Sequence, residues 1–160
     1  YAFDLSKESI QLAAKSDQEW KVKWFVGDLA RLPLLDQSMN LLLDIFSPAN
    51  YQEFKRVLAP DGRLIKVIPT ATHLQEIRQK VKDHLDQVDY SNEQIIQHFS
   101  DHFTIENTIH CQETFELTPA LREALLSMTP LLFHVDPAQI DWTDLTQITI
   151  SATILIGRSN

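Results

Sequence analysis

The sequence has few of the residues that build several common classes of protein. Its 160 residues include one cysteine, Cys111, which excludes an internal disulfide and a zinc site made of several cysteines within the chain. No apolar run approaches the roughly 20 residues that a membrane-spanning helix needs, and the first residues lack the basic and apolar segments of a secretion signal. We therefore expect a reducing, cytoplasmic environment, no membrane partner and no metal bound by this chain.

Glycine is also scarce. The chain has three glycines, at positions 27, 62 and 157, and none of them belongs to a glycine-rich loop. Folds that bind dinucleotides and related ligands open with a strand followed by such a loop, where backbone amides approach the ligand closely. If the chain takes part in such a ligand-binding site, it would supply the parts of the site other than the glycine-rich loop.

Basic residues are rare in the second half of the chain. Residues 1–82 contain 12 Lys and Arg against 10 Asp and Glu, whereas residues 83–160 contain 2 against 12. The halves therefore carry +2 and −10, and the whole chain carries −8. Because nucleic-acid binding depends on cationic contacts to phosphate, the acidic half is a poor match for RNA. RNA would have to be held mostly by the first half or by residues outside this chain. Alternatively, the negative charge of the second half belongs to an ordinary solvated surface that has no role in binding.

The stretch EFKRVLAPDGRLIKVIP, residues 53–69, carries the clearest structural pattern. Apolar residues recur at helical spacing before Pro60, which ends the helix. Asp61 and Gly62 follow as a turn in which glycine can take a positive φ. Residues 63–68 then form a strand with little polar content, as in a sheet covered on both faces. A helix that leads through a tight turn into a buried strand is half of a βαβ unit.

The rest of the chain alternates in the same way, and no linker, repeat or low-complexity tract divides residues 1–160 into more than one domain. Hydrophobic periodicity and turn residues predict strands at 1–3, 22–26, 39–46, 63–68, 103–117 (as one or two strands) and 146–156, and helices at 6–15, 50–58, 74–88, 92–99 and 119–128. This order predicts an α/β fold with a mostly parallel sheet and an antiparallel edge strand.

The helix, the pattern R-V-L-x-P-x-G and the apolar strand that ends in proline resemble elements of Rossmann-like S-adenosylmethionine-dependent methyltransferases. More particular motifs accompany them in order: Asp4-Leu5-Ser6-Lys7, Arg31-Leu32-Pro33, Ile45-Phe46-Ser47-Pro48, Pro69 with His73-Leu74-Gln75-Glu76, and Met128-Thr129-Pro130. This order, over nearly the whole chain, is similar to that of the 23S ribosomal RNA (guanine-N1)-methyltransferases.

The resemblance implies that residues 1–160 are the C-terminal catalytic part of such an enzyme, without its zinc-binding N-terminal part, first strand and glycine-rich loop. In this family's sheet the absent strand lies between the strands that correspond to residues 1–3 and 39–46. Its loss leaves unpaired edges in mid-sheet, and we expect those two strands not to pair directly. Another polypeptide segment, a domain swap in a homo-oligomer or a rearranged sheet would fill the gap. The chain alone should bind S-adenosylmethionine poorly and be inactive.

The resemblance places three residues against the cofactor. Asp4, at the carboxyl end of its strand, would bind the ribose hydroxyls, since a carboxylate offers two acceptors; its alternative role is at the start of the following helix. Asp28 would accept a hydrogen bond from the adenine amino group, with the Leu29 amide beside it. The alternative for Asp28 is an ordinary aspartate in a turn.

Residues 44–50 cover the end of a strand, where catalytic residues gather in such sheets. Guanine N1 carries a hydrogen at neutral pH and loses it as the methyl group arrives, so a nearby acceptor is useful. Asp44 is the candidate base and Phe46 the candidate stacking surface for a flipped guanine. A strand-end aspartate held by local amides and a phenylalanine in the core are the alternatives. Ser47 and Pro48 would line the substrate side.

His73 falls in the loop after the strand that ends at Pro69. It would contact the substrate or order the lip of the pocket; alternatively, it is a histidine at a helix start that is bound to backbone. Met128-Thr129-Pro130 would lie on the same rim. His98 and His102 have a spacing that suits a metal, but polar helices produce such pairs by chance. We assign no metal to this chain and expect zinc only in the absent N-terminal part.

Three functions are compatible with the sequence. The first, favoured by the resemblance, is methylation of guanine N1 in a 23S ribosomal RNA hairpin by the intact protein, with S-adenosylmethionine as cofactor. The second is a methyltransferase of similar fold that acts on a small molecule, for which the acidic half is no obstacle. The third is a truncated interaction module that has kept the fold and lost the site.

Overall fold

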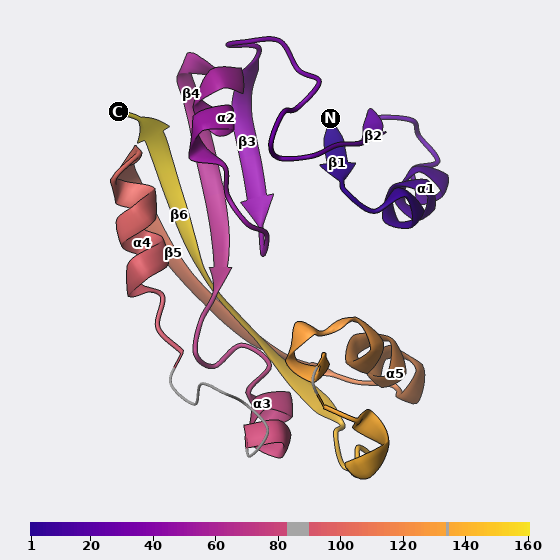
Figure 1. Cartoon of the computed structure of the whole chain (residues 1–160). Coiled ribbons are helices and arrows are strands. Elements are labelled where there is room, and N and C mark those ends of the chain that lie inside the picture. The colour runs from indigo at the N-terminus through magenta and orange to yellow at the C-terminus, as the bar shows by residue number, and fades with distance from the viewer. Residues whose placement is uncertain (83–89, 134) are drawn as a thin grey trace.

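The computed structural model describes residues 1–82, 90–133 and 135–160. Helices and strands alternate along much of the chain (Figure 1). They are β1 (Ala2–Asp4), α1 (Lys7–Ser16), β2 (Trp24–Val26), β3 (Met39–Ile45), α2 (Tyr51–Val57), β4 (Leu58–Pro69), α3 (Gln75–Val81), α4 (Glu93–Ser100), β5 (Phe103–Glu116), α5 (Pro119–Met128) and β6 (Gln147–Ser159), with 3₁₀ turns at Pro130–Leu132 and Pro137–Gln139.

The strands form two separate sheets. β3, β4, β6 and β5 lie side by side in that order, and β1 pairs with β2 in a small parallel sheet. In the larger sheet β3 and β4 are parallel, whereas β6 is antiparallel to both of its neighbours, β4 and β5. The α/β alternation was predicted correctly, but the prediction of a mostly parallel sheet is wrong. The antiparallel part is large because β5 and β6 contain 14 and 13 residues and pair along almost their whole length.

β1 and β3 are not paired with each other, as the sequence led us to expect. In Figure 1 the small sheet stands apart from the free edge of β3. A cavity of 710 Å³ lies between them, lined by Ala2 and Phe3 of β1 and by Leu41 and Leu43 of β3. Among the described residues no strand fills this space, so two strand edges face each other unpaired.

Two hydrophobic cores hold the larger sheet. The first joins α2 and α4 to one face of the sheet and consists of Tyr51, Phe54, Leu58, Leu64, Ile68, Phe99, Phe103 and Leu155. The second consists of Leu74, Ile77, Val81, Leu132, Val135, Leu145 and Ile148. Since β6 contributes Leu155 to the first core and Ile148 to the second, one strand links the two cores.

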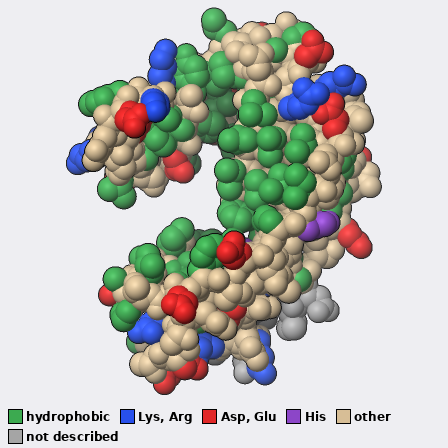
Figure 2. Space-filling model, turned by 180° about the vertical axis from the view of Figure 1, so that it is seen from behind, with side chains coloured by type: hydrophobic (Ala, Val, Ile, Leu, Met, Phe, Trp, Pro, Cys, Tyr) green, Lys and Arg blue, Asp and Glu red, His purple; other side chains and the backbone are tan. Residues whose placement is uncertain are grey.

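The opposite face of the sheet is apolar and exposed at β3. Leu41, Leu43 and Ile45 share this face because side chains alternate along a strand, and they are 51%, 57% and 55% exposed. Figure 2 shows hydrophobic side chains gathered beside the hollow between the two sheets. A cluster of exposed apolar side chains marks an interaction surface, and this one adjoins the unpaired edge of β3.

The turn between α2 and β4 differs from the expected one. β4 begins directly after the helix, at Leu58, and none of the chain's glycines has a positive φ. Gly62 is needed because of crowding instead: a Cβ there would lie 2.9 Å from the Ala59 carbonyl oxygen and 3.0 Å from that of Met39. The glycine therefore permits a close approach of backbone segments rather than a left-handed turn.

The other elements differ from the predictions mainly at their ends. Ser6 caps α1 and accepts a hydrogen bond from Ser9 N at 3.1 Å. β5 is a single strand, where one or two were predicted. α3 covers the start of the predicted helix 74–88, of which residues 83–88 lie outside the described residues. No helix in the described part of the chain is long and apolar enough to cross a membrane.

The two faces of the larger sheet should respond differently to truncation of a leucine. Leu64 is fully buried on the helix-covered face, so Leu64→Ala should lower the free energy of unfolding by about 2–5 kcal/mol. Leu43, on the exposed face, is the matched control, and Leu43→Ala should lower it by less than about 1 kcal/mol. Urea unfolding of residues 1–160 measures both values, and equal losses would contradict the assignment of the faces.

Candidate active site

Two cavities meet at the turn between β3 and α2. The larger has a volume of 1040 Å³, and the smaller is the 710 Å³ cavity between β1 and β3. Ser47 and Pro48 line both cavities. Since β3 is parallel to β4 and ends at Ile45, this turn lies at the carboxyl end of a parallel strand, where α/β sheets place their active sites.

The smaller cavity brings together the three residues that the sequence analysis assigned to a cofactor. Asp4 ends β1, Asp28 and Leu29 follow β2, and all three line this cavity. A hydrogen bond of 3.1 Å from Gly27 N to the Asp4 carbonyl oxygen joins the two strand ends. Because β1 and β2 are parallel, their carboxyl ends fall at the same edge of the sheet.

Each aspartate also has the local role that was its alternative. Asp4 Oδ1 accepts a hydrogen bond from Ser6 N at 2.7 Å at the start of α1, and Asp28 Oδ1 accepts one from Ala30 N at 2.8 Å. Each bond uses one oxygen of a carboxylate that has two. The local role and a ligand-binding role are therefore compatible, since the turn bond orients the carboxylate.

The loop that follows Asp28 is fixed to α2 by charged side chains. Glu53 is buried and accepts a hydrogen bond from Leu32 N at 2.6 Å. Arg56 donates to Glu53 and, at 3.0 Å, to the Leu32 carbonyl oxygen. The hydrogen bond from Arg56 holds the pKa of Glu53 below its ordinary value. This clamp fixes one wall of the smaller cavity, because Leu32 itself lines it.

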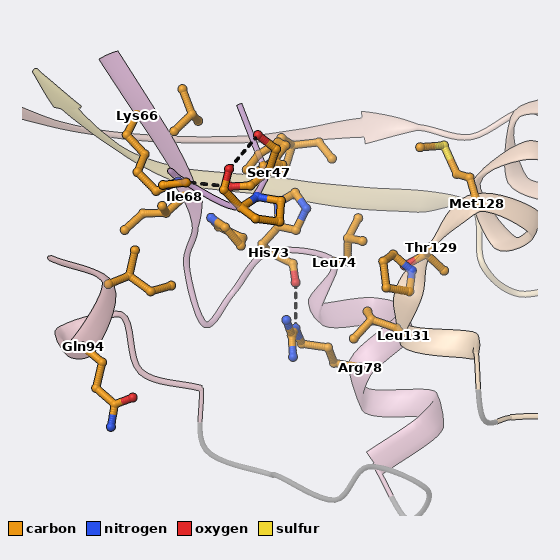
Figure 3. A pocket seen from close by; sticks show the side chains of 18 of the residues that line it. Ser47, Lys66, Ile68, His73, Leu74, Arg78, Gln94, Met128, Thr129 and Leu131 are labelled. Atoms are coloured by element: carbon orange, nitrogen blue, oxygen red, sulfur yellow. Dashed lines mark hydrogen bonds between the residues drawn. The ribbon is translucent and has the colours of Figure 1, made fainter. Parts of the chain in front are cut away.

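Asp44 is buried within a closed set of bonds. Its carboxylate lies 2.6 Å from Lys66 Nζ and accepts a hydrogen bond from Ser47 Oγ. Lys66 also donates to the Ser47 carbonyl oxygen at 3.0 Å (Figure 3). The side chain of Asp44 is 1% exposed and that of Lys66 is 5% exposed. Such burial of charge requires pairing and hydrogen bonding, and both groups have them.

Phe46 has an unusual backbone conformation in the turn after Asp44. Its φ is 51°, in the left-handed region that disfavours a bulky residue, and its amide donates to the Val67 carbonyl oxygen at 3.1 Å. The ring lies 5.0 Å from that of His73, tilted by 44°, and both residues line the larger cavity. Phe46 is 49% exposed, so it is not the core residue of the alternative interpretation. Backbone outliers of this kind concentrate at functional sites.

His73 is bound to backbone and also lines the larger cavity. Its Nδ1 accepts a hydrogen bond from Ser151 N at 3.3 Å, so the neutral ring carries its hydrogen on Nε2. Burial, together with the positive charge of Arg78, lowers the pKa of His73. The ring is therefore neutral at pH 7, with Nε2–H as a hydrogen-bond donor.

The larger cavity is mostly apolar, and its charged lining residues are positive. No Asp or Glu among the described residues lines it, whereas Lys66 and Arg78 do. Arg78 Nε donates to the His73 carbonyl oxygen at 3.0 Å (Figure 3). Met128-Thr129-Pro130 lines the same cavity, as the sequence analysis expected. The described residues contain no group of three or more potential metal ligands.

Sequence reasoning missed Lys66, Glu53 and Arg56, which position the site. Lys66 lies within residues 63–68, a stretch predicted to be a buried strand, and a lysine there signals a buried partner because an unpaired charge is costly. Glu53 and Arg56 are three residues apart and so share one side of a helix. That spacing indicates an ion pair, but it does not reveal the loop that the pair holds.

The fold that surrounds these cavities is found in methyltransferases of known structure. An S-adenosylmethionine-dependent methyltransferase from Aquifex aeolicus matches 96% of the chain and 67% of its own chain, with a TM-score of 0.53 and 13% identity. One from Thermotoga maritima matches 99% and 72%, with a TM-score of 0.55 and 17% identity. The chain therefore has the fold of the S-adenosylmethionine-dependent methyltransferases.

Within that class, the chain is homologous to the 23S rRNA (guanine-N1)-methyltransferases over nearly its whole length, which confirms the resemblance. It is 34% identical over 157 residues to "Putative 23S rRNA (guanine-N(1)-)-methyltransferase YxjB" of Bacillus subtilis, covering 96% of the chain and 55% of the relative. It is 25% identical to the 23S rRNA (guanine(748)-N(1))-methyltransferase of Streptomyces fradiae, covering 97% and 56%. The chain thus spans about half the length of these relatives. No protein-family model matches it.

The clamp on the loop after Asp28 should make stability depend on pH. Because the folded-state pKa of Glu53 lies below its ordinary value, the clamp stabilises the fold above the ordinary carboxyl pKa and is lost as the pH falls through the folded value. Glu53→Gln should therefore lower the free energy of unfolding by about 1–3 kcal/mol at pH 7, with a smaller difference at pH 3. Denaturant unfolding at the two pH values measures this.

Glu123→Gln, on the exposed surface of α5, is the matched control for this prediction. It should change the free energy of unfolding by no more than about 0.5 kcal/mol at either pH. A loss from Glu53→Gln that is the same at pH 7 and pH 3 would contradict the role of the Glu53 charge.

Proposed function

We propose that this chain is the downstream part of the catalytic domain of an S-adenosylmethionine-dependent enzyme that methylates N1 of a guanine in 23S rRNA. One observation carries the proposal: Ser47 and Pro48 line both cavities. One of these cavities is lined by the two aspartates of the strand ends, Asp4 and Asp28, and the other by Phe46 and His73. A methyl donor in the first and a base in the second would meet at this turn.

The residues of the smaller cavity fit a nucleoside. S-adenosylmethionine supplies a reactive methyl group when it is bound. Asp4 would accept hydrogen bonds from the ribose hydroxyls and Asp28 one from the adenine amino group, each through the oxygen that its turn bond leaves unused. Leu5 and Leu29 supply apolar walls beside them. This combination of acceptors and apolar surface suits a ribose and a purine.

The larger cavity fits a flipped guanine. Phe46 presents a half-exposed ring, and unpaired bases bind by stacking on aromatic side chains. The Nε2–H of His73 would donate to an acceptor on the edge of the base. Arg78 is the lining cation that is not paired with a carboxylate among the described residues, and it favours a base that is attached to phosphate.

Asp44 is not the group to which we assign removal of the N1 hydrogen. Its carboxylate accepts a hydrogen bond from Ser47 and is paired with Lys66, and the side chain is 1% exposed. A general base must come within hydrogen-bond reach of the hydrogen that it removes, and this carboxylate is enclosed by its own partners. We assign to Asp44 the fixing of the turn that follows it.

The site also needs a polypeptide segment from outside residues 1–160. The facing edges of β1 and β3 are open, and the curated relatives are about twice as long as this chain. We propose that the remaining part of the intact protein supplies a strand that pairs with both edges, together with the loop that closes the smaller cavity. Exchange of this strand between two copies of the protein is the competing arrangement.

The handedness of βαβ connections supports this completion. α2 connects the parallel strands β3 and β4 and covers the face that carries Leu64. The connection from the added strand to β1 would cross the sheet in the direction opposite to the connection from β3 to β4. Because both connections are right-handed, the helix in it would lie on the face opposite to α2. That face is the one on which Leu41, Leu43 and Ile45 are exposed.

The intact protein should transfer a labelled methyl group from S-adenosylmethionine to 23S rRNA, with N1-methylguanosine as the product found by mass spectrometry. Asp4→Asn and Asp28→Asn each replace a charged acceptor, so each should weaken cofactor binding about tenfold, equal to about 1.4 kcal/mol. Asp61→Asn, at an exposed position near the start of β4, is the control and should bind as the wild type does. Methylation of a small molecule but not of rRNA would overturn the RNA assignment; the acidic second half favours that second candidate.

Residues 1–160 alone should bind S-adenosylmethionine at least about 100-fold more weakly than the intact protein, equal to about 2.7 kcal/mol, because one wall of the smaller cavity is absent. Calorimetry with both proteins measures the difference. Addition of the remaining part as a separate polypeptide should restore binding. Tight binding by residues 1–160 alone would contradict the need for an added strand and loop.

A further inference from the structure

We propose that Lys66 is a positioning residue whose ammonium group, paired with Asp44, holds the turn of residues 46–48 at the junction of the two cavities. The inference rests on the proposed function for what the turn positions, namely a methyl donor and a base. How the turn is held follows from the described contacts alone.

The pair is built from two adjacent strands. Asp44 of β3 and Lys66 of β4 are direct partners in the parallel register, so their side chains leave the same face of the sheet. The 2.6 Å contact between them therefore depends on backbone pairing rather than on a loop. Sites built on strands are held more precisely than sites built on loops.

Two consecutive residues of the turn, Phe46 and Ser47, are held by hydrogen bonds to Asp44 and to residues of β4. Ser47 donates through its hydroxyl to Asp44 and accepts through its carbonyl oxygen from Lys66. The amide of Phe46 is held by the Val67 carbonyl oxygen. These bonds account for the positive φ of Phe46, since a strained conformation persists only where its surroundings fix it.

Stability alone does not explain an ammonium group at this position. Replacement of a buried ion pair by apolar residues of similar volume is often neutral or stabilising, so the pair is weak evidence for a stabilising role. The neighbours of Lys66 in β4, Ile65 and Val67, are apolar, as are most residues of that strand. What Lys66 adds is a directed bond to the Ser47 carbonyl oxygen. Because Ser47 lines both cavities, a small displacement there would misalign any two ligands that react across it.

The first test uses amide hydrogen exchange in residues 1–160 and needs no ligand. Asp44→Asn/Lys66→Met removes both charges and the bond to the Ser47 carbonyl oxygen, while the introduced asparagine side chain keeps an acceptor for the serine hydroxyl. Exchange of the Phe46 amide should accelerate at least about tenfold, whereas amides of the β4–β6 pair should keep their rates. Lys15→Met, at the exposed end of α1, is the control and should change neither. An unchanged Phe46 rate in the double variant would overturn the proposal.

The second test measures turnover and thermal stability of the intact protein. Lys66→Met leaves the Asp44 charge buried without its partner and should lower both Tm and kcat. The double variant should recover most of the Tm, yet its kcat should stay at least about tenfold below that of the wild type. Its KM values for cofactor and RNA should stay within about threefold, because the misalignment acts on the reacting geometry.

The outcomes separate the positioning role from the proposed function. A double variant with wild-type kcat would mean that Lys66 only balances a charge, and the proposal would be wrong. If the Phe46 amide exchanges faster in the double variant but the wild-type protein methylates no guanine, the proposed function is wrong. The positioning role of Lys66 in the turn of residues 46–48 would still be supported.

Discussion

β4 is the constraint on which the other parts of the molecule depend, because it is hydrogen-bonded along both of its edges. Its parallel pairing with β3 sets Lys66 beside Asp44, and its antiparallel pairing with β6 fixes the long ribbon of β5 and β6. At its end, Pro69 leads into the loop that carries His73. The positions of the turn, of the aromatic pair and of both cores therefore follow from the pairing of this one strand.

The sequence was most informative where local patterns decide the structure. The predicted helices 6–15 and 119–128 correspond closely to α1, which Ser6 caps, and to α5, which begins at Pro119. Asp4 and Asp28 were expected at neighbouring strand ends, and they line one cavity because parallel strands end at a common edge. The gap between β1 and β3 was expected for a different reason: the resemblance implied the order of the strands in the sheet and the absence of the strand between these two.

The parts that could not be predicted depend on contacts between distant residues. Lys66 meets Asp44 across 22 positions, and Glu53 meets Leu32 across 21, and no local period records either contact. The long antiparallel ribbon was missed for a related reason. The residue pattern predicts the two strands, but it does not show which strands they pair with. In the folded sheet β6 is antiparallel to both β4 and β5, and this makes most of the pairing in the larger sheet antiparallel. Local propensity gives elements, whereas pairing is a property of the assembled sheet.

β6 takes part in both hydrophobic cores, and the larger cavity is lined by members of each: Tyr51 and Ile68 from the first core and Leu74 from the second. The ribbon of β5 and β6 spans the molecule between these two groups (Figure 1). The separation of these two parts of the lining therefore depends on the shape of β6, the strand that both cores share. Substitutions along the exposed edge of β5 would then change which ligand the larger cavity accepts, although the substituted residues do not contact that ligand.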